Sequence, residues 1–242
     1  MQRIIFLVIS LFFVCLSQAF AQQQEPPKGP WSGSLGIGFL NVSGNAESRS
    51  SNAEGLLAFD KGKWHHELLG RALGQSQNNV STAEAYKLAY NLEYDFTDRT
   101  YAFGLVDWNK DLFGAFSEQS FEIAGIGRRF IVSDKHLLNG EIGVGATQNE
   151  AQDGTTDEEF VTRLSGDYTW NISENAVFSQ TLAVNISSAN TFLESVTALK
   201  TSIAGPVGLS VSYTVRNNSD VLPGTKKTDT WTAINLDYSF GK

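Results

Sequence analysis

One alternating segment decides the fold of this chain: Tyr86-Lys87-Leu88-Ala89-Tyr90-Asn91-Leu92-Glu93-Tyr94-Asp95-Phe96. Every second residue in it is a tyrosine, a leucine or a phenylalanine, and the residues between them are charged, polar or small. Because successive side chains of a β-strand point to opposite faces, this segment has one apolar face and one charged face. The stretches 207–216 and 232–240 repeat the pattern, and after Trp31 no segment has the period of an amphipathic helix.

The turn signals of the chain predict twelve strands, at 31–42, 47–60, 63–75, 83–96, 99–111, 118–131, 136–148, 157–170, 175–188, 191–204, 207–217 and 228–240. Even-numbered connections are tight, such as Gly205-Pro206, whereas odd-numbered ones tend to be longer, such as 149–156 and 218–227. Around Val106, Ile126 and Val196, apolar residues fall on both faces of the predicted strand. The strands are longer than the five or six residues of an ordinary sheet, and their length suits a crossing of a membrane.

These features together predict an all-β fold, a transmembrane antiparallel up-and-down barrel of the bacterial outer-membrane type, with about twelve strands and both termini in the periplasm. Aromatic residues at the tight-turn ends of the strands predict a periplasmic girdle, made of Trp31, Trp64, Tyr94, Phe96, Tyr101, Trp170, Tyr238 and Phe240. Alternation alone does not say which face points outward, so a secreted soluble β-protein is the alternative. Charges in the middle of long strands, with aromatic bands at their ends, favour the membrane barrel.

The N-terminal residues predict export. Arg3 precedes an apolar run at 4–16, and Ala19 and Ala21 fit a cleavage site, so residues 1–21 read as a signal peptide. Residues 22–30 contain three of the five prolines and are predicted to be a periplasmic linker, which leaves 31–242 as the barrel domain. The single cysteine, Cys15, lies in the signal peptide, so the exported chain has no disulfide and no thiolate metal site. A net charge of −8 argues against binding of nucleic acid.

The polar face of the strands would line the lumen. The predicted lumen charges are Glu54, Arg71, Lys87, Glu122, Glu141, Arg163, Asp167, Lys200 and Arg216, and the same face carries Glu67, Glu93, Asp95, Arg128, Glu194, Asp229 and Asp237. Twelve strands lie between the eight of a filled barrel and the sixteen to eighteen of an open porin. The first functional hypothesis is a narrow passive channel for ions or small polar solutes, with Glu54, Arg71, Glu141 and Arg163 near mid-height as selectivity residues. The second is a structural or surface-interaction barrel, in which these charges pair and plug the lumen and the long loops form the contact surface.

An outer-membrane enzyme that modifies lipids is a third hypothesis, because His65, His66 and His136 lie on the tight-turn side. The chain has no Gly-x-Ser-x-Gly nucleophile elbow and no paired-histidine metal motif, so no catalytic, cofactor-binding or metal-binding residue is predicted. Four acids in one loop, Asp153, Asp157, Glu158 and Glu159, do not have EF-hand spacing and indicate a solvated loop. The expected partners are outer-membrane lipids and lipopolysaccharide, the barrel-assembly machinery that reads the aromatic C-terminal ending, and a small polar solute or ion.

Several glycine-rich and aromatic motifs resemble those of a named family. They are Trp31-Ser-Gly33-Ser-Leu-Gly36, Ser43-Gly44-Asn45-Ala46-Glu47, Asp111-Leu-Phe113, Gly125-Ile-Gly127-Arg-Arg-Phe130 and Leu138-Asn-Gly140-Glu141-Ile-Gly143-Val-Gly145. In order and spacing they are similar to the blocks of the salt-induced outer-membrane protein family, the domain-of-unknown-function family 481, although Ala46 replaces the usual threonine. The resemblance covers the whole exported chain and implies a barrel in the outer membrane of a Gram-negative bacterium. It brings no established activity, and the family's name suggests a response of the envelope to salt or osmotic conditions.

Overall fold

A computed structural model describes residues 29–42 and 48–241 of the chain. The predicted signal peptide 1–21, residues 22–28 of the predicted linker, and the Ser43–Glu47 motif lie outside the described residues. Over the described residues, no helix is long and apolar enough to cross a membrane.

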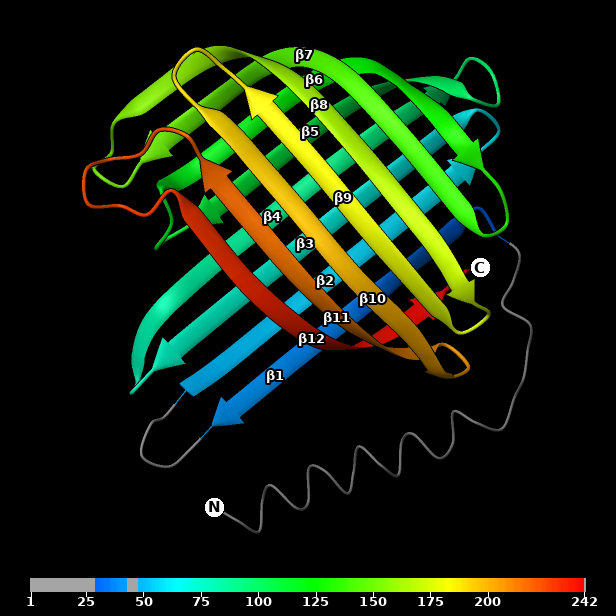
Figure 1. Cartoon of the computed structure of the whole chain (residues 1–242), viewed down its shortest axis with the longest axis horizontal. Helices are drawn as coiled ribbons and strands as arrows, with labels where there is room; N and C mark the ends of the chain where they lie inside the picture. The colour runs from blue at the N-terminus through cyan, green and yellow to red at the C-terminus, as the bar shows by residue number, and fades with distance from the viewer. Residues whose placement is uncertain (1–28, 43–47, 242) are drawn as a thin grey trace.

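The described residues form one closed antiparallel barrel of twelve strands, in which each strand pairs with its neighbours in sequence and β1 pairs with β12 (Figure 1). The strands are β1 (Trp31–Val42), β2 (Ser48–Lys61), β3 (Trp64–Gln77), β4 (Val80–Asp95), β5 (Thr100–Asp111), β6 (Phe116–Val132), β7 (His136–Ala151), β8 (Thr156–Ser173), β9 (Ala176–Ile186), β10 (Thr191–Ala204), β11 (Val207–Asn218) and β12 (Thr228–Phe240). The start of β1 and the end of β12 lie at the same end of the barrel as the tight turns. The predicted fold is confirmed.

Some predicted loops are in fact parts of strands. β7 and β8 continue through most of the predicted loop 149–156 and leave only 152–155 unpaired. β3 and β4 continue to a two-residue turn at Asn78 and Asn79, whose φ angles are 50° and 63°. Asparagine tolerates this left-handed conformation, which a two-residue hairpin turn requires. At these hairpins the expectation of longer loops was therefore wrong, because the extra residues extend the strands.

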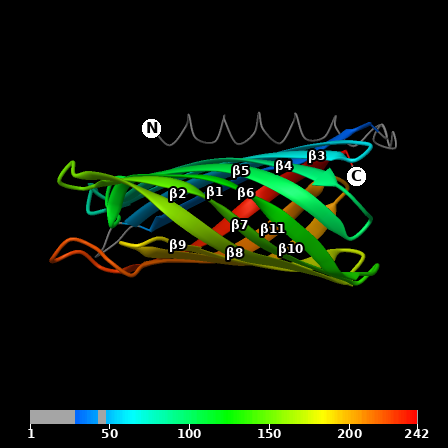
Figure 2. The ribbon, with the colours of Figure 1, turned by 90° about the horizontal axis from the view of Figure 1, so that it is seen from above.

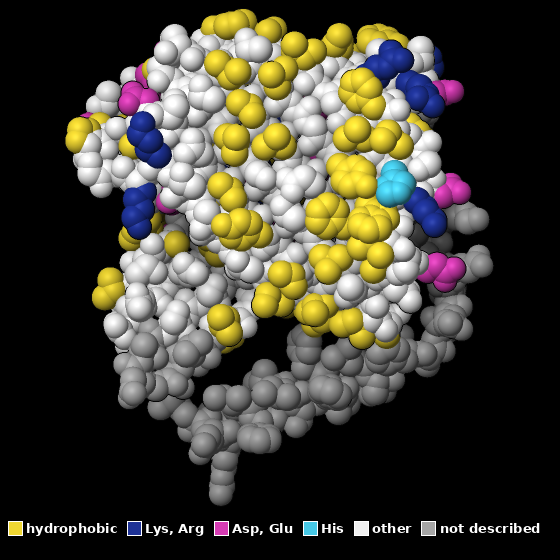
Figure 3. Space-filling view, viewed as in Figure 1, with side chains coloured by type: hydrophobic (Ala, Val, Ile, Leu, Met, Phe, Trp, Pro, Cys, Tyr) yellow, Lys and Arg dark blue, Asp and Glu magenta, His cyan; other side chains and the backbone are white. Residues whose placement is uncertain are grey.

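The outer surface of the barrel is apolar. Leu35, Ile126 and Ile234 point outward and are 57%, 57% and 59% exposed. Hydrophobic side chains cover the middle of the face in Figure 3, and the charged side chains gather towards the two ends of the strands. Water would oppose so large an exposed apolar area, whereas a lipid bilayer would accept it. The polarity of this barrel is therefore that of a membrane barrel, with its charges inside.

Aromatic side chains surround the tight-turn end on the outside. Trp31 packs on Phe59 with ring centroids 4.6 Å apart, and Trp64 packs on Tyr94 at 4.7 Å. The register also turns Trp170, Tyr238 and Phe240 outward, and Phe96 is exposed in the turn after β4.

Tyr101 was wrongly predicted to belong to this girdle. It is 1% exposed and lies inside the barrel, where its hydroxyl donates to a Glu141 carboxylate oxygen at 3.0 Å. The guanidinium of Arg129 lies over its ring, 4.6 Å from the centroid. The reason is the register of β5, which pairs Tyr101 with Gly127 on the inner face. Apolar residues occur on both faces of β5, so the sequence pattern could not orient this strand.

The barrel is flattened, with its two walls close together when seen from above (Figure 2). One side of its interior is filled by an apolar cluster made of Tyr101, Phe103, Phe121, Ile123, Val161 and Phe192. Phe121 of β6 stacks on Phe192 of β10 at 5.5 Å between centroids, although these strands are not neighbours. Glycines make room for this cluster: a Cβ on Gly127 would lie 2.2 Å from the Tyr101 ring.

Gly127→Val should therefore destabilise the barrel, because the added side chain meets the buried ring of Tyr101. We expect the free energy of unfolding to fall by roughly 1–3 kcal/mol, measured as a lower temperature of the heat-modifiable shift in gel migration. The matched control is Gly70→Val, since nothing lies within 4 Å of a Cβ at the outward-facing Gly70. An equal loss of stability in both variants would contradict this account of the glycines.

Candidate functional site: a charge cluster across the lumen

Four buried charged side chains meet inside the barrel. They are Lys87 of β4, Asp107 of β5, Glu194 of β10 and Arg216 of β11, and they are called the lumenal charge cluster below. The Lys87 Nζ lies 2.9 Å from Asp107 Oδ2 and 2.9 Å from Glu194 Oε1. The Arg216 Nε lies 2.6 Å from Glu194 Oε2. Each charge therefore has at least one partner of opposite sign.

Two of the cluster's contacts cross the lumen. β4 and β10 lie on opposite sides of a closed ring of twelve strands, as do β5 and β11. The ion pair between Lys87 and Glu194 and the hydrogen bond from Arg216 Nη2 to Asn109 Oδ1, at 3.0 Å, are therefore crossing contacts. The other two ion pairs, between Lys87 and Asp107 and between Glu194 and Arg216, each join neighbouring strands of one wall.

Local sequence explains how the long side chains reach across. On the inner face of β4, Lys87 has Ala85 and Ala89 as its neighbours, and both are buried and small. They leave space for the lysine chain to extend towards the opposite wall. On β11, the Arg216 guanidinium lies 4.9 Å from the ring centroid of Trp231, which holds it against β12. Burial of an ion without a partner would cost several kcal/mol. These four charges can therefore be buried in the lumen only because they pair with one another.

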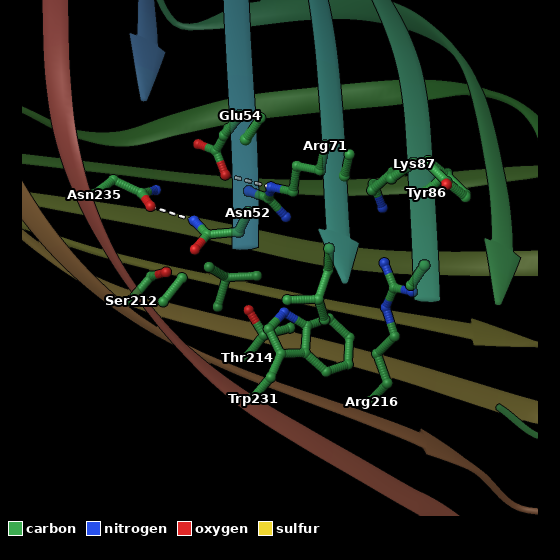
Figure 4. A pocket seen from close by; sticks show the side chains of 16 residues that line it. Asn52, Glu54, Arg71, Tyr86, Lys87, Ser212, Thr214, Arg216, Trp231 and Asn235 are labelled. Carbon is green, nitrogen blue, oxygen red and sulfur yellow. Dashed lines mark hydrogen bonds and ion pairs between the residues drawn. The ribbon is translucent and has the colours of Figure 1, made fainter. Parts of the chain in front are cut away.

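A small cavity of about 50 Å³ adjoins the cluster on the side away from the apolar cluster. Charged and amide side chains from both walls line it, together with apolar ones such as Ala85, Val196 and Trp231 (Figure 4). Glu54 and Arg71 form an ion pair at 2.5 Å, and an Asn52 amide donates to the Asn235 side chain. In Figure 4, Lys87 and Arg216 point towards one another from opposite walls. The lumen is thus divided into an apolar side and a polar side.

The structure places most of the predicted lumen charges on the inner face. They are Glu54, Arg71, Lys87, Glu141, Arg163, Asp167, Lys200 and Arg216, together with Glu67, Glu93, Asp95, Glu194, Asp229 and Asp237. That these residues line a passage for ions or small polar solutes stays a prediction. The sequence reading missed Asp107 and Arg129, which also face inward, because β5 and the end of β6 do not alternate clearly.

Glu122 was wrongly predicted to face the lumen. It is exposed on the outer face of β6, and Arg128 on the same strand also points outward. The cause is the apolar cluster, because Phe121 and Ile123 occupy the inward positions on either side of Glu122. A rule that places apolar residues on the outer face therefore assigns the wrong faces to the residues in this part of β6.

The four predicted selectivity residues do not form one site. Glu54 pairs with Arg71 on neighbouring strands, as above. Glu141 accepts hydrogen bonds from the hydroxyls of Tyr101 and Ser165, at 3.0 and 2.8 Å. Arg163 donates from Nη1 to the Asn185 side chain at 3.1 Å. The residues that meet across the lumen are those of the charge cluster, two of which, Lys87 and Arg216, were among the predicted lumen charges.

Asp237 is buried without a full set of partners. It is 7% exposed, and among the described residues its Oδ2 has no hydrogen-bond partner, as is also true of Arg163 Nε. The carboxylate lies against Gly36, where a Cβ would be 2.4 Å from Asp237 Oδ1. The Gly36-Ile37-Gly38 motif therefore gives space to side chains of β12 inside the barrel, including the Asp237 carboxylate.

The three histidines contact carboxylates or tyrosines. His65 faces inward, with its ring nitrogens 2.9 Å from Asp60 Oδ1 and 2.9 Å from Asp95 Oδ2. His66 and His136 face outward and contact the hydroxyls of Tyr90 and Tyr168, at 2.7 and 2.8 Å. All three histidines lie near the tight-turn end of the barrel.

The acidic residues after β7 do not gather into one site. The carboxylate of Asp153 accepts the backbone N–H of Thr155, which holds the pKa of Asp153 below its ordinary value. Asp157 accepts from Asn149, and Glu159 accepts from Ser188 and the backbone of Ala189. In the described part of the chain, no group of three or more His, Cys, Asp or Glu side chains is arranged to hold a metal ion.

Comparisons with known proteins agree with the fold. Residues 35–240 match the family described as "Protein of unknown function, DUF481". The chain is 30% identical over 213 residues to the uncharacterized protein YdiY of Escherichia coli (strain K12), with coverage of 88% of this chain and 84% of that protein. The NanC porin structure has a TM-score of 0.51 at 9% identity, covering 86% of this chain and 98% of NanC. The KdgM porin in complex with disordered oligogalacturonate has a TM-score of 0.47 at 10% identity, covering 87% and 99%.

Glu194→Gln should destabilise the barrel strongly, because Arg216 then loses its ion-pair partner inside the lumen. We expect the free energy of unfolding to fall by roughly 3–5 kcal/mol, measured by urea titration of the barrel in lipid vesicles with tryptophan fluorescence. Glu158→Gln is the control, since Glu158 faces outward at the end of β8 that lies away from the tight turns. If the two variants lost equally little stability, the cluster would not be a buried ionic network.

Proposed function

The chain belongs to the DUF481 family, and we propose that it is an outer-membrane barrel that conducts ions or small polar solutes through a narrow, charge-lined passage. The observation that carries this proposal is the division of the lumen. The apolar cluster fills one side, whereas the other side holds charged and amide side chains and a cavity. A barrel that served only as a scaffold could fill its lumen with apolar side chains throughout, and it would avoid the cost of burying charges.

The proposed location is the outer membrane of a Gram-negative bacterium, with both chain ends in the periplasm. The apolar outer surface, the aromatic girdle at the tight-turn end and the even number of strands support it. Residues 1–21 would direct export as a signal peptide, and 22–30 would be a periplasmic linker. The barrel-assembly machinery would insert the chain, and membrane lipids and lipopolysaccharide would surround it.

The proposed passage prefers cations. Acids outnumber bases on the inner face, and Asp237 adds a carboxylate oxygen that has no partner among the described residues. Electrostatic attraction by such a surface raises the local concentration of cations in a narrow passage. The passage would run along the polar side, past the ion pair of Glu54 and Arg71 and through the lumenal charge cluster.

A plugged structural or surface-interaction barrel is the second candidate. The crossing contacts and the stacked pair of Phe121 and Phe192 favour it, because they join the two walls. Its contact surface would be the loops at 152–155 and 219–227. A role in the envelope's response to salt belongs to either candidate. A lipid-modifying enzyme finds less support, since the sequence has no Gly-x-Ser-x-Gly nucleophile elbow and the ring hydrogen bonds of the three histidines go to aspartates and tyrosines rather than to a serine.

Conductance tests the channel. The chain refolded into a planar lipid bilayer should give discrete current steps, because the proposed passage along the polar side of the lumen would carry ions. Absence of steps over many insertions, with the circular dichroism of a β-barrel intact, would favour the plugged barrel instead.

Asp237→Asn tests the origin of the cation preference. In a gradient of KCl, the reversal potential of the native barrel should show that K⁺ permeates better than Cl⁻. The substitution should lower the permeability ratio several-fold, because it removes a carboxylate from the polar side. Glu158→Gln removes a charge from the outer face and should leave the ratio unchanged. A native preference for Cl⁻, or a ratio that Asp237→Asn does not alter, would contradict the assignment.

Fractionation of cells that express the full chain tests the location. We expect the protein in the outer-membrane fraction, with heat-modifiable migration and an N-terminus that begins at Gln22. Recovery in a soluble fraction without detergent would contradict the membrane location, and an N-terminus at Met1 would contradict the signal peptide.

A further inference from the structure

The four charges of the lumenal charge cluster can satisfy one another in two arrangements, and only one of these joins the two walls. We infer that the cluster is a gate, in which the Lys87–Glu194 ion pair closes the polar side of the lumen and its separation opens it. This inference rests on the proposed channel function.

In the closed arrangement, Lys87 and Glu194 each have two partners. Lys87 contacts Asp107 on its own wall and Glu194 on the other wall, both at 2.9 Å. Glu194 contacts Arg216 on its own wall at 2.6 Å and Lys87 across the lumen. The crossing ion pair is therefore the second partner of both residues.

Separation of the crossing pair leaves no charge alone. Lys87 keeps Asp107, Glu194 keeps Arg216, and Arg216 keeps its position against the Trp231 ring. Asn109 gives up its crossing hydrogen bond, but its own amide still donates to Asp107 Oδ1 at 2.9 Å. A buried ion pair normally resists separation, because each ion would lose its last partner. Here Lys87 and Glu194 each keep one ion-pair partner, so separation does not leave a buried charge alone.

The side chains also have space to move. The cavity of about 50 Å³ borders both Lys87 and Arg216, and small residues flank Lys87 along β4. Because the on-wall pairs are between neighbouring strands, the barrel's hydrogen-bonded ladders can stay as they are. On the other side of the lumen, the apolar cluster does not take part, so the opening is confined to the polar side.

Three variants at the cluster test the gate by single-channel recording. Lys87→Gln removes the crossing ion pair and the ion pair with Asp107, while Glu194 keeps Arg216 and Asp107 keeps the hydrogen bond from Asn109. The ratio of open to closed time should therefore rise by about tenfold in the barrels that fold. Asp107→Asn removes the on-wall partner of Lys87 and leaves the crossing pair as its ion pair, so the ratio should fall by a similar factor.

The sharpest variant is the charge swap Lys87→Glu with Glu194→Lys. It preserves the crossing pair and the net charge of the lumen, but each swapped residue now faces a like charge on its own wall. The crossing pair becomes the favourable pairing that remains, so the channel should stay closed. The matched control is the swap Lys110→Glu with Glu118→Lys, because these residues face each other on the outer surface of β5 and β6. Heat-modifiable migration identifies folded barrels in every case.

A fixed pore gives a different result. In a fixed pore the substitutions would change the current amplitude and the reversal potential but not the open and closed times, and the swap at the cluster would conduct like the native barrel. Either result would overturn the gate while leaving the channel in place. A silent native barrel with a conducting Lys87→Gln variant would support the gate. Silence of the native barrel and of folded Lys87→Gln would overturn the proposed channel as well.

Discussion

The pairing of β1 with β12 is the constraint on which the rest of the structure depends. In hydrocarbon an open sheet edge would leave a row of backbone N–H and C=O groups without partners, so a membrane sheet must close. Here closure is made over a short register, from Gly33 opposite Phe240 to Ile37 opposite Leu236, whereas β1 pairs with β2 from Trp31 to Val42. Side chains reinforce the seam. Asn52 of β2 bonds with Asn235 of β12, above Gly38 of the strand between them.

Closure of the barrel also determines which side chains must be buried in the lumen. Once the apolar side chains face outward, polar ones must be accommodated inside, in a space narrowed by the flattening of the barrel. The barrel buries its inward-facing side chains in two ways. In the apolar cluster, which β5, β6, β8 and β10 contribute, inward-facing side chains pack as a soluble protein's core does. Elsewhere several of the charges pair with one another, as Lys87 does with Asp107 and Glu194. The polar cavity begins at the boundary between the apolar cluster and the paired charges.

The limits of the sequence reading follow from this division. Turn signals predicted the strand count, and the even count with its alternating turn lengths predicted the barrel. Strict alternation predicted the inward position of Lys87 and Arg216, because on β4 and β11 the polarity of a residue reports its face. On β5 and β6 it does not, since Phe103, Phe121 and Ile123 are apolar and inward. The errors at Tyr101 and Glu122, and the omission of Asp107, all come from these two strands. Which charges meet could not be predicted, because that depends on which strands oppose each other across a flattened barrel.

The long hairpins at one end of the barrel also bury polar side chains on their inner faces. β6, β7 and β8 extend well past the length that crosses a bilayer, and their inner faces there carry amide and hydroxyl side chains such as Gln119, Asn149 and Thr147. These groups bond to one another, with Gln119 and Thr147 both donating to Asn149. Neutral polar side chains carry no ionic desolvation cost, so the mouth of the barrel can be polar without needing paired charges. Ion pairs lie elsewhere in the lumen, between Lys87 and Glu194 across the walls and between Arg129 and Glu93 or Asp95 nearer the tight-turn end.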